Sequence, residues 1–232
     1  MKLEVRKSLI GGALFAILLA ISSTSYAGTI IKLNLGGVGP DVSMAGGVLG
    51  TVSDGNALTV GDQNTAIEFT GFLNPIPDIN LSAASFSLGG LALNGPAQTF
   101  GTLVIQNYQG GAFSLYDPSN TLLLSGTLGS SALTGVMGPP GTGGLFTTSL
   151  STVTGGTLQP FILPNTLTLS MNLSTVNGGN GLAVDGGLLL PFLADASVNI
   201  AGDADPNGNI PEPTAIVLVV LSAVGLAAAR LR

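Results

Sequence analysis

The sequence predicts an all-β fold: an antiparallel β-sandwich over residues 28–201, with a hydrophobic segment at each end of the chain. Three observations lead to this prediction. Short segments alternate apolar and polar residues, which is typical of strands with one face in a core. Gly-Gly pairs separate these segments. No segment between residues 28 and 201 has the period and the capping residues of a long helix.

The clearest strand covers 167–174. Every second residue in it is apolar: Leu167, Leu169, Met171 and Leu173. The residues between them are Ser, Thr and Asn, so one face should lie in a core and the other in water. The same alternation predicts strands at 31–35, 66–69, 85–88 and 197–200, and 102–106 is expected to be a more buried strand.

Turns and loops separate these strands. The sequence Asp-Pro-Ser-Asn at 117–120 predicts a turn, because Asp is favoured at the first position and Pro fits the second. This turn would join 113–116 to 121–124 in a hairpin. The two prolines within 137–144 predict a long loop, and 202–213 is expected to be a linker.

A β-solenoid is the alternative to the sandwich. Solenoids repeat one structural unit at a fixed sequence interval. The Gly-Gly pairs follow one another at intervals of 10, 43, 21, 33, 12, 23 and 8 residues, which is not a fixed repeat. The pattern therefore favours the sandwich.

Residues 1–27 have the three parts of a secretory signal peptide. Three basic residues lie within the first seven, and the apolar stretch 9–21 is too short for a comfortable membrane span. Ser25 and Ala27 place small residues at the two positions that a signal peptidase reads. We expect cleavage between Ala27 and Gly28 and export of the remaining chain.

Residues 214–232 form a hydrophobic tail with an uncharged run at 215–229. A Pro-Glu-Pro triplet precedes it: Pro211, Glu212 and Pro213. A helix over this run is about 22 Å long against a hydrocarbon core of roughly 30 Å, and long Arg side chains can reach the headgroups to make up the difference. Arg230 and Arg232 predict a cytoplasmic end, so the tail should be a transmembrane helix that leaves 28–201 outside.

The triplet, the apolar helix and the Arg-containing end, in this order, resemble the PEP-CTERM sorting signal of Gram-negative-type bacteria. The resemblance covers 210–232. It implies anchoring in the inner membrane, processing by an exosortase-type membrane peptidase, and a mature protein at the cell surface or outside the cell. Members of the family are tied to exopolysaccharide or biofilm production, so the resemblance also implies an exopolysaccharide partner.

Composition excludes several classes of function. Ten of the twelve acids but one of the six bases, Lys32, lie within 28–210, a net charge of −9, and such a surface repels nucleic acid. The chain has no Cys and no His, which excludes thiol chemistry, a Ser-His-Asp triad and zinc sites built on these residues. We therefore expect a non-enzymatic surface or extracellular-matrix protein.

Two other functions stay open. A carbohydrate-binding module would bring Tyr108, Tyr116 and acidic residues together on one groove or face. A carboxylate-dependent secreted hydrolase would place two acids on opposite sides of a cleft.

One segment is similar to a calcium loop. Asp203, Asp205 and Asn207 occupy the first, third and fifth positions, with Gly and Ile at the sixth and eighth. The twelfth position, normally Glu, is Thr214, and two prolines interrupt the loop. A polar linker without a cofactor is the simpler interpretation, and calcium is the alternative.

Lys32 could either be solvated or form a covalent bond to an Asn side chain. Some adhesin domains join a Lys of the first strand to an Asn of the last strand with the help of an acid, and Lys32, Asn199 and Glu68 fit these three parts. That reaction needs a buried Lys, whereas the alternation places Lys32 opposite to the apolar face. We therefore expect a solvated Lys.

Overall fold

The computed structural model describes residues 28–36, 39–53, 62–73, 83–139, 143–163 and 165–205. These ranges hold fifteen strands and three short 3-10 helices, at Gly71–Leu73, Gln159–Phe161 and Val176–Gly179. In chain order the strands are β1 (Gly28–Asn34), β2 (Val42–Ala45), β3 (Val48–Thr51), β4 (Asp62–Phe69), β5 (Ala84–Gly89), β6 (Leu91–Leu93), β7 (Gln98–Phe100), β8 (Leu103–Gln109), β9 (Ala112–Tyr116), β10 (Leu122–Val136), β11 (Gly144–Gly155), β12 (Thr168–Ser174), β13 (Val184–Asp185), β14 (Leu188–Leu189) and β15 (Phe192–Gly202). No helix in these ranges is long and apolar enough to cross a membrane. The predicted signal peptide and hydrophobic tail lie outside them.

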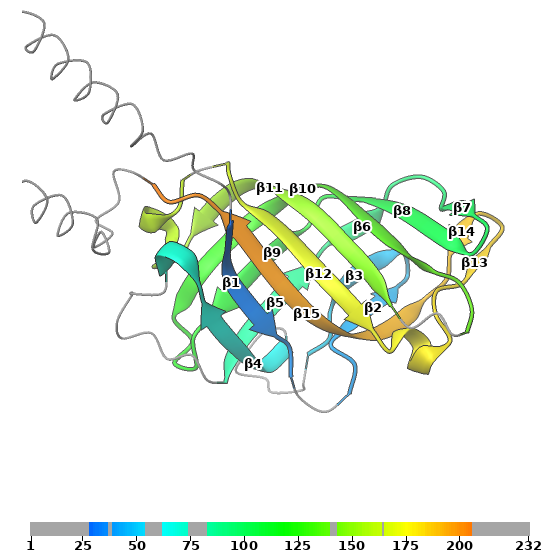
Figure 1. The fold of residues 1–232 in the computed structure, drawn as a ribbon, viewed down its shortest axis with the longest axis horizontal. Helices are drawn as coiled ribbons and strands as arrows, with labels where there is room; N and C mark the ends of the chain where they lie inside the picture. Colours follow the sequence, from blue (N-terminus) through cyan, green and yellow to red (C-terminus); the bar gives the residue numbers. More distant parts are fainter. Residues whose placement is uncertain are drawn as a thin grey trace, which may run out of the picture.

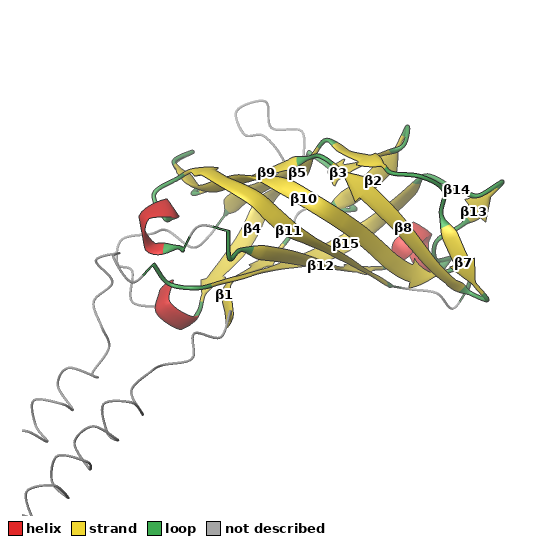
Figure 2. Cartoon of the chain, turned by 90° about the horizontal axis from the view of Figure 1, so that it is seen from above, coloured by secondary structure: helices red, strands yellow, loops and turns green. Residues whose placement is uncertain are grey.

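The all-β, antiparallel prediction is confirmed. Thirteen strands form one sheet, in the order β1-β4-β5-β9-β10-β11-β12-β15-β2-β3-β6-β8-β7, and β13 and β14 form a separate hairpin. The sheet closes on itself because the first strand, β1, pairs with both β4 and the last strand, β15. Seen from above, the sheet folds over so that β9, β5 and β3 face β12 and β15 across the interior (Figure 2).

Two long strands each hold two sets of partners. β15 pairs with β2 through 192–194 and with β1 through 197–202. β10 pairs with β9 through 122–127 and with β8 through 131–136. Together with β11 and β12 these strands run obliquely along the body and join its two ends (Figure 1).

The core follows the cross-strand register. One inner row crosses β1, β15, β12, β11 and β10 through Leu33, Val198, Met171, Phe146 and Leu133. Each of these side chains is buried. Burial of apolar area in such rows supplies most of the free energy that stabilises the fold.

Most predicted strands and turns are confirmed. The apolar residues of 167–174 are all buried, and β9 and β10 form the hairpin expected around 117–120. Asp117 caps that turn: its Oδ1 accepts hydrogen bonds from Ser119 N at 2.9 Å and from Thr121 N at 2.7 Å. The Gly-Gly pair at 46–47 turns between β2 and β3, and the pair at 186–187 turns between β13 and β14.

The expected buried strand at 102–106 is wrong in its pattern. β8 begins at Leu103 and alternates, so Val104, Gln106 and Tyr108 point inward while Leu103 is 37% exposed. Gln106 fits the interior because its Nε2 donates hydrogen bonds to the carbonyl oxygens of Gly95 and Asn107, at 3.1 and 2.8 Å. These bonds offset the cost of burying the Nε2 group, while the buried Oε1 has no partner among the described residues.

The segment after β15 stays attached to the domain as far as the structure describes it. Ala204 forms a β-bridge with Ile162, and Asp205 N donates a hydrogen bond to Phe161 O at 3.0 Å. Asp203 N donates to Thr166 Oγ1 at 3.1 Å. Residues 206–232 lie outside the described ranges, and with them most of the expected linker.

Candidate functional site

The outer face of the sheet carries small polar side chains in register. One row crosses seven strands through Asn107, Ala132, Thr147, Ser170, Asn199, Lys32 and Glu68. It is the outward half of the alternation whose inward half forms the core row, so the five strands of the core row contribute one residue to each row. Apart from Lys32 and Glu68, the row is uncharged.

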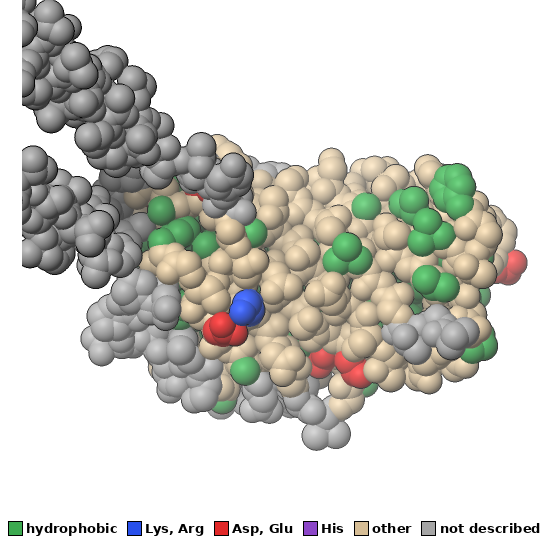
Figure 3. Space-filling view, in the orientation of Figure 1, with side chains coloured by type: hydrophobic (Ala, Val, Ile, Leu, Met, Phe, Trp, Pro, Cys, Tyr) green, Lys and Arg blue, Asp and Glu red, His purple; other side chains and the backbone are tan. Residues whose placement is uncertain are grey.

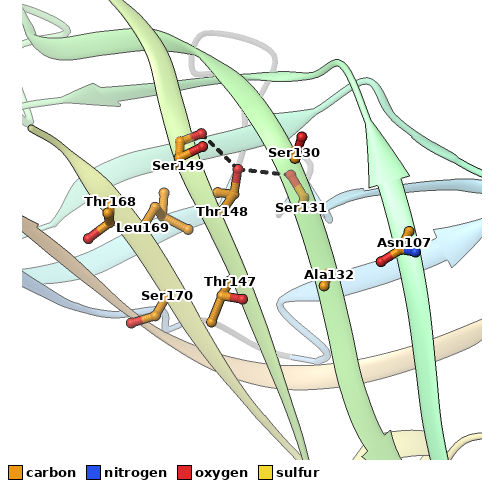
Figure 4. A pocket seen from close by; sticks show the side chains of 10 residues that line it. All are labelled: Asn107, Ser130, Ser131, Ala132, Thr147, Thr148, Ser149, Thr168, Leu169 and Ser170. Atoms are coloured by element: carbon orange, nitrogen blue, oxygen red, sulfur yellow. Dashed lines mark hydrogen bonds between the residues drawn. The ribbon is translucent and has the colours of Figure 1, made fainter. Parts of the chain in front are cut away.

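A shallow groove of about 440 Å³ lies over the β10 and β11 part of this row. Ten residues line it, and seven of them are Ser or Thr: Asn107, Ser130, Ser131, Ala132, Thr147, Thr148, Ser149, Thr168, Leu169 and Ser170. They come from four neighbouring strands or their bulges, and none carries a charge (Figure 4). We call it the hydroxyl groove.

A buried hydroxyl pair forms part of this groove. Ser131 Oγ donates to Thr148 Oγ1 at 2.8 Å, and Thr148 Oγ1 donates to Ser149 O at 2.9 Å (Figure 4). Both side chains are 5% exposed and lie where the β10–β11 register shifts at a bulge. Because they bond to each other, they are fixed in place and not offered to a ligand.

The outer hydroxyls of the groove are available to a ligand. Thr147, Ser149 and Thr168 are exposed and Ser170 is half-buried. None of their hydroxyls hydrogen-bonds to another residue within the described ranges. Each hydroxyl can donate one hydrogen bond and accept two, so the groove suits a ligand that presents hydroxyl or amide groups.

A second groove, of about 350 Å³, lies farther along the same row. Lys32 Nζ and Glu68 Oε1 are 3.1 Å apart in it, with side chains 49% and 63% exposed. Asn199 pairs directly with Lys32, so the register brings together all three residues considered for a Lys–Asn bond. Lys32 is nevertheless solvated, as expected, and an exposed ion pair of this kind keeps the amine in contact with water.

The two tyrosines do not form the shared platform that a carbohydrate-binding module would need. Tyr108 is 1% exposed, and its ring lies in a T-shaped arrangement with the ring of Phe146, with centroids 6.1 Å apart. Burial raises the pKa of the Tyr108 phenol above its usual value. Tyr116 is half-buried at the end of β9. The expectation that Tyr108 lies on a face shared with Tyr116 and acidic residues is therefore wrong, because the alternation in β8 turns the Tyr108 ring into the core.

Glu68 and Asp195 line different grooves, whereas Asp41 binds the main chain on both sides of Asp195. Asp195 lines a groove with Pro40 and Asn177, whereas Glu68 lines the groove with Lys32. Asp41 is 6% exposed, and its Oδ2 accepts a hydrogen bond from Ala196 N at 2.6 Å. Asp117 belongs to its turn.

The calcium candidate is described in part. The main chains of Asp203 and Asp205 bind the 161–166 segment, and Asn207 lies outside the described residues. Among the described residues, no three or more His, Cys, Asp or Glu side chains lie close enough together to hold a metal ion.

No protein-family model, curated protein or solved structure matches this chain.

The two ends of the described domain lie side by side. Gly28, the residue after the predicted cleavage site, pairs with Gly202 across β1 and β15. The other targeting residues lie outside the described ranges: Ala27, Pro211, Glu212, Pro213, Arg230 and Arg232. Any segments that precede Gly28 and follow Gly202 therefore join the domain at the same end of the sheet.

Sequence reasoning used the apolar half of the strand pattern and passed over the polar half. The signal for the hydroxyl groove was present as Thr147, Ser149, Thr168 and Ser170 at alternate positions. The strand order needed to bring them together was not in the sequence pattern.

Proposed function

We propose that this chain is an exported, non-enzymatic surface or extracellular-matrix protein. Its C-terminal segment would hold it in the inner membrane until an exosortase-type peptidase processes it near Glu212. The observation that carries the proposal is the pairing of Gly28 with Gly202. A domain whose two connections leave from one end can stand away from a bilayer, and neither connection has to cross its surface.

We also propose that the exported domain is a two-layered sandwich and not a solenoid. In a solenoid each repeat contacts only its sequence neighbours, so the first strand would not pair with the last strand as β1 does with β15. Closure also leaves few free sheet edges, which favours solubility in an exported domain without disulfides.

A non-enzymatic role is favoured over a carboxylate-dependent hydrolase. Glycosidases need two carboxyl groups about 5 to 9.5 Å apart on either side of the substrate. The hydroxyl groove is lined by no carboxylate, and the grooves of Asp195 and Glu68 are lined by one each among the described residues.

The proposed partner is an uncharged stretch of exopolysaccharide in the hydroxyl groove. Sugar hydroxyls can exchange hydrogen bonds with Thr147, Ser149, Thr168 and Ser170, and a groove without charged side chains suits an uncharged ligand because no ion has to lose its water on contact. The groove has no aromatic platform, so we expect weak contacts repeated along a long polymer, whose total strength comes from multivalency.

Intact mass spectrometry of the protein from its native host tests the proposal. We expect a chain that begins at Gly28 and lacks the residues after the Pro-Glu-Pro triplet. Glu212→Ala should retain the hydrophobic tail, whereas the matched acid substitution Glu68→Ala should be processed normally. Recovery of the unprocessed chain 1–232 from the cytosol would refute the proposal.

A further inference from the structure

Three Asn-Gly pairs lie within the described ranges, at 94–95, 177–178 and 180–181, and a fourth, 207–208, lies outside them. In such a pair the main-chain nitrogen of Gly can attack the side-chain amide of the Asn before it, because Gly has no Cβ to hinder the approach. The attack requires an Asn side chain that is free to turn toward that nitrogen, and a nitrogen that is not held in a hydrogen bond. The three described pairs differ in both respects.

The pair at 177–178 is held by hydrogen bonds at both reacting groups. Asn177 Oδ1 accepts a hydrogen bond from Leu193 N at 3.2 Å, and Asn177 Nδ2 donates one to Gly181 O at 3.0 Å. The attacking nitrogen is bonded as well, because Gly178 N donates to Thr175 O at 2.8 Å. Attack at Asn177 therefore requires this part of the structure to open first.

The pair at 180–181 is restrained in the same way. Asn180 Nδ2 donates a hydrogen bond to Asn177 O at 2.8 Å. Its attacking nitrogen, Gly181 N, donates to Val176 O at 3.0 Å. These two pairs thus protect each other within one short turn of the chain.

The pair at 94–95 has neither restraint. Asn94 and Gly95 are exposed, and neither the Asn94 side-chain amide nor the Gly95 N–H forms a hydrogen bond to another described residue. No described atom lies within 4 Å of the place where a Cβ of Gly95 would stand. Two bonds fix the chain here without using the reacting groups: Asn94 N donates to Asn107 O at 2.9 Å, and Gln106 Nε2 donates to Gly95 O at 3.1 Å.

We propose that Asn94 is a site of spontaneous deamidation in the folded protein. The Gly95 nitrogen forms a bond to Cγ of Asn94, the Cγ–Nδ2 bond breaks, and Nδ2 leaves as ammonia with the proton from Gly95. Water then opens the resulting five-membered imide ring at either of its two carbonyl groups. The products are Asp, and isoaspartate in which the main chain runs through the former side chain, and each is about 1 Da heavier than Asn.

The isoaspartate product disturbs the bonds on both sides of the pair. It adds one carbon atom to the main chain between Asn94 N and Gly95 O, so at least one of their bonds to Asn107 and Gln106 has to shift. Gln106 is buried, and its Oε1 already has no partner among the described residues. Loss of the bond to Gly95 O would therefore destabilise the packing of β8.

Both products also place a carboxylate in a groove of about 600 Å³ next to the hydroxyl groove. Asn94 and Gln109 line it, and it shares Asn107, Ser130 and Ser131 with the hydroxyl groove. Its described lining residues carry no charge, and charged side chains are sparse on the face shown in Figure 3. The added charge would weaken contact with an uncharged polysaccharide; this consequence rests on the proposed function, whereas the reaction does not.

Peptide mapping of the full chain, kept in detergent at mildly alkaline pH, tests the proposal. Samples taken over time are digested with pepsin in acid, which slows further deamidation, and the mass of each Asn-Gly peptide is measured. We expect Asn94 to gain about 1 Da roughly tenfold faster than Asn177 and Asn180, because those two must first break hydrogen bonds. In urea, where no pair is protected, all three should react at similar rates.

Asn94→Gln is the matched variant, because it keeps an amide group but would have to close a larger ring. It should show no mass gain at this position over the period in which the wild type reacts, and its far-ultraviolet circular dichroism spectrum should be unchanged. A folded chain in which Asn94 reacts as slowly as Asn177 and Asn180, while all three react in urea, would overturn the proposal.

A separate comparison tests the effect on binding. Asn94→Asp reproduces the charge of the product and should be retained less by neutral polysaccharide than Asn94→Gln. Equal retention of the two variants would contradict the consequence for binding. The mass gain at Asn94 is measured without polysaccharide, so a failure of the proposed function is distinguishable from a failure of the deamidation.

Discussion

The hydroxyl of Thr51 binds the main chain of Leu88 twice. It accepts a hydrogen bond from Leu88 N at 3.0 Å and donates one to Leu88 O at 3.3 Å. Thr51 ends β3 and Leu88 lies in β5, two strands with no direct backbone pairing among the described residues. One side chain thus bridges a seam of the sheet where the ladder of main-chain hydrogen bonds is missing.

Thr51→Val should destabilise the domain by about 1–3 kcal/mol. The two side chains have nearly the same shape, so the main effect is to leave the buried Leu88 N–H without its partner. Urea denaturation of the mature protein, followed by circular dichroism, measures this change. Thr127→Val, at an exposed position of β10, is the control and should change stability by less than about 0.5 kcal/mol. Equal effects of both substitutions would contradict the bridging role.

We expect Asp41 to stabilise the domain at the point where β15 changes its pairing from β2 to β1. Its carboxylate accepts the hydrogen bond from Ala196 N, between the residues that pair with β2 and those that pair with β1. Asp41→Ala should cost about 2–3 kcal/mol because a buried N–H loses a charged acceptor. Asp41→Asn keeps an acceptor oxygen and should cost clearly less. Denaturation midpoints of the two variants, compared at neutral pH, decide the point.

The turn at Asp117 should make stability depend on pH. Slight desolvation acts to raise the pKa of Asp117, but hydrogen bonds from Thr121 and Ser119 together outweigh it and lower the pKa below its usual value. A carboxyl group with a lowered folded-state pKa stabilises the fold above its unfolded pKa of about 3.9, and this contribution is lost as pH falls through the folded value.

Asp117→Asn provides the test of this pH dependence. The variant should be less stable than the wild type at pH 6, and the difference between them should shrink as the pH falls below about 4. Chemical denaturation across this range gives the two curves. A difference that stays constant with pH would show that Asp117 does not contribute through its charge.

A charge in the hydroxyl groove should weaken retention by neutral polysaccharide. Thr147→Glu puts a carboxylate among the hydroxyls of Ser149, Thr168 and Ser170 and disfavours their contact with sugar. Affinity electrophoresis in gels that contain the neutral fraction of the host's own exopolysaccharide measures the change in mobility. Ala112→Glu, an exposed position on β9 outside the groove, adds the same charge and should be retained like the wild type. Equal loss in both variants would argue against the groove.

Lys32 should contribute little to stability and form no covalent bond. The Lys32–Glu68 ion pair is exposed, so Lys32→Met should change the free energy of unfolding by less than about 1 kcal/mol. The mature mass should also show no loss of about 17 Da, which is the mass of one ammonia that a Lys–Asn bond would release. Such a loss, abolished by Asn199→Ala, would restore the covalent interpretation.

The strands and their inward faces were predictable where the type of each residue, apolar or polar, shows whether its side chain points into the core. Leu169 and Met171 alternate with polar residues, and the core row follows directly from that alternation. Asp117 predicted its turn through chemistry within four residues. Such features depend on local sequence, which is all that a pattern can report.

The inward polar residues were not predictable, because their hydrogen bonds depend on groups that the fold brings next to them. The Gln106 amide N–H groups bond to Gly95 O as well as to the neighbouring Asn107 O, and Ser131 bonds to Thr148 across a bulge. Gly126 lies within β10, where a Cβ atom would be 2.7 Å from Thr152 O, so its absence of a side chain serves close packing and not a turn. These roles depend on strand order, which the sequence pattern does not contain.

The contact between β1 and β15 joins residues about 170 positions apart. During synthesis the first strand emerges long before its last partner exists, so the sheet cannot close on itself until the whole domain has been made. Proteins dominated by such distant contacts fold slowly, because the chain must search for them before they contribute any stability. Until β15 has been made, one side of β1 offers unpaired N–H and C=O groups to any strand edge or chaperone that it meets.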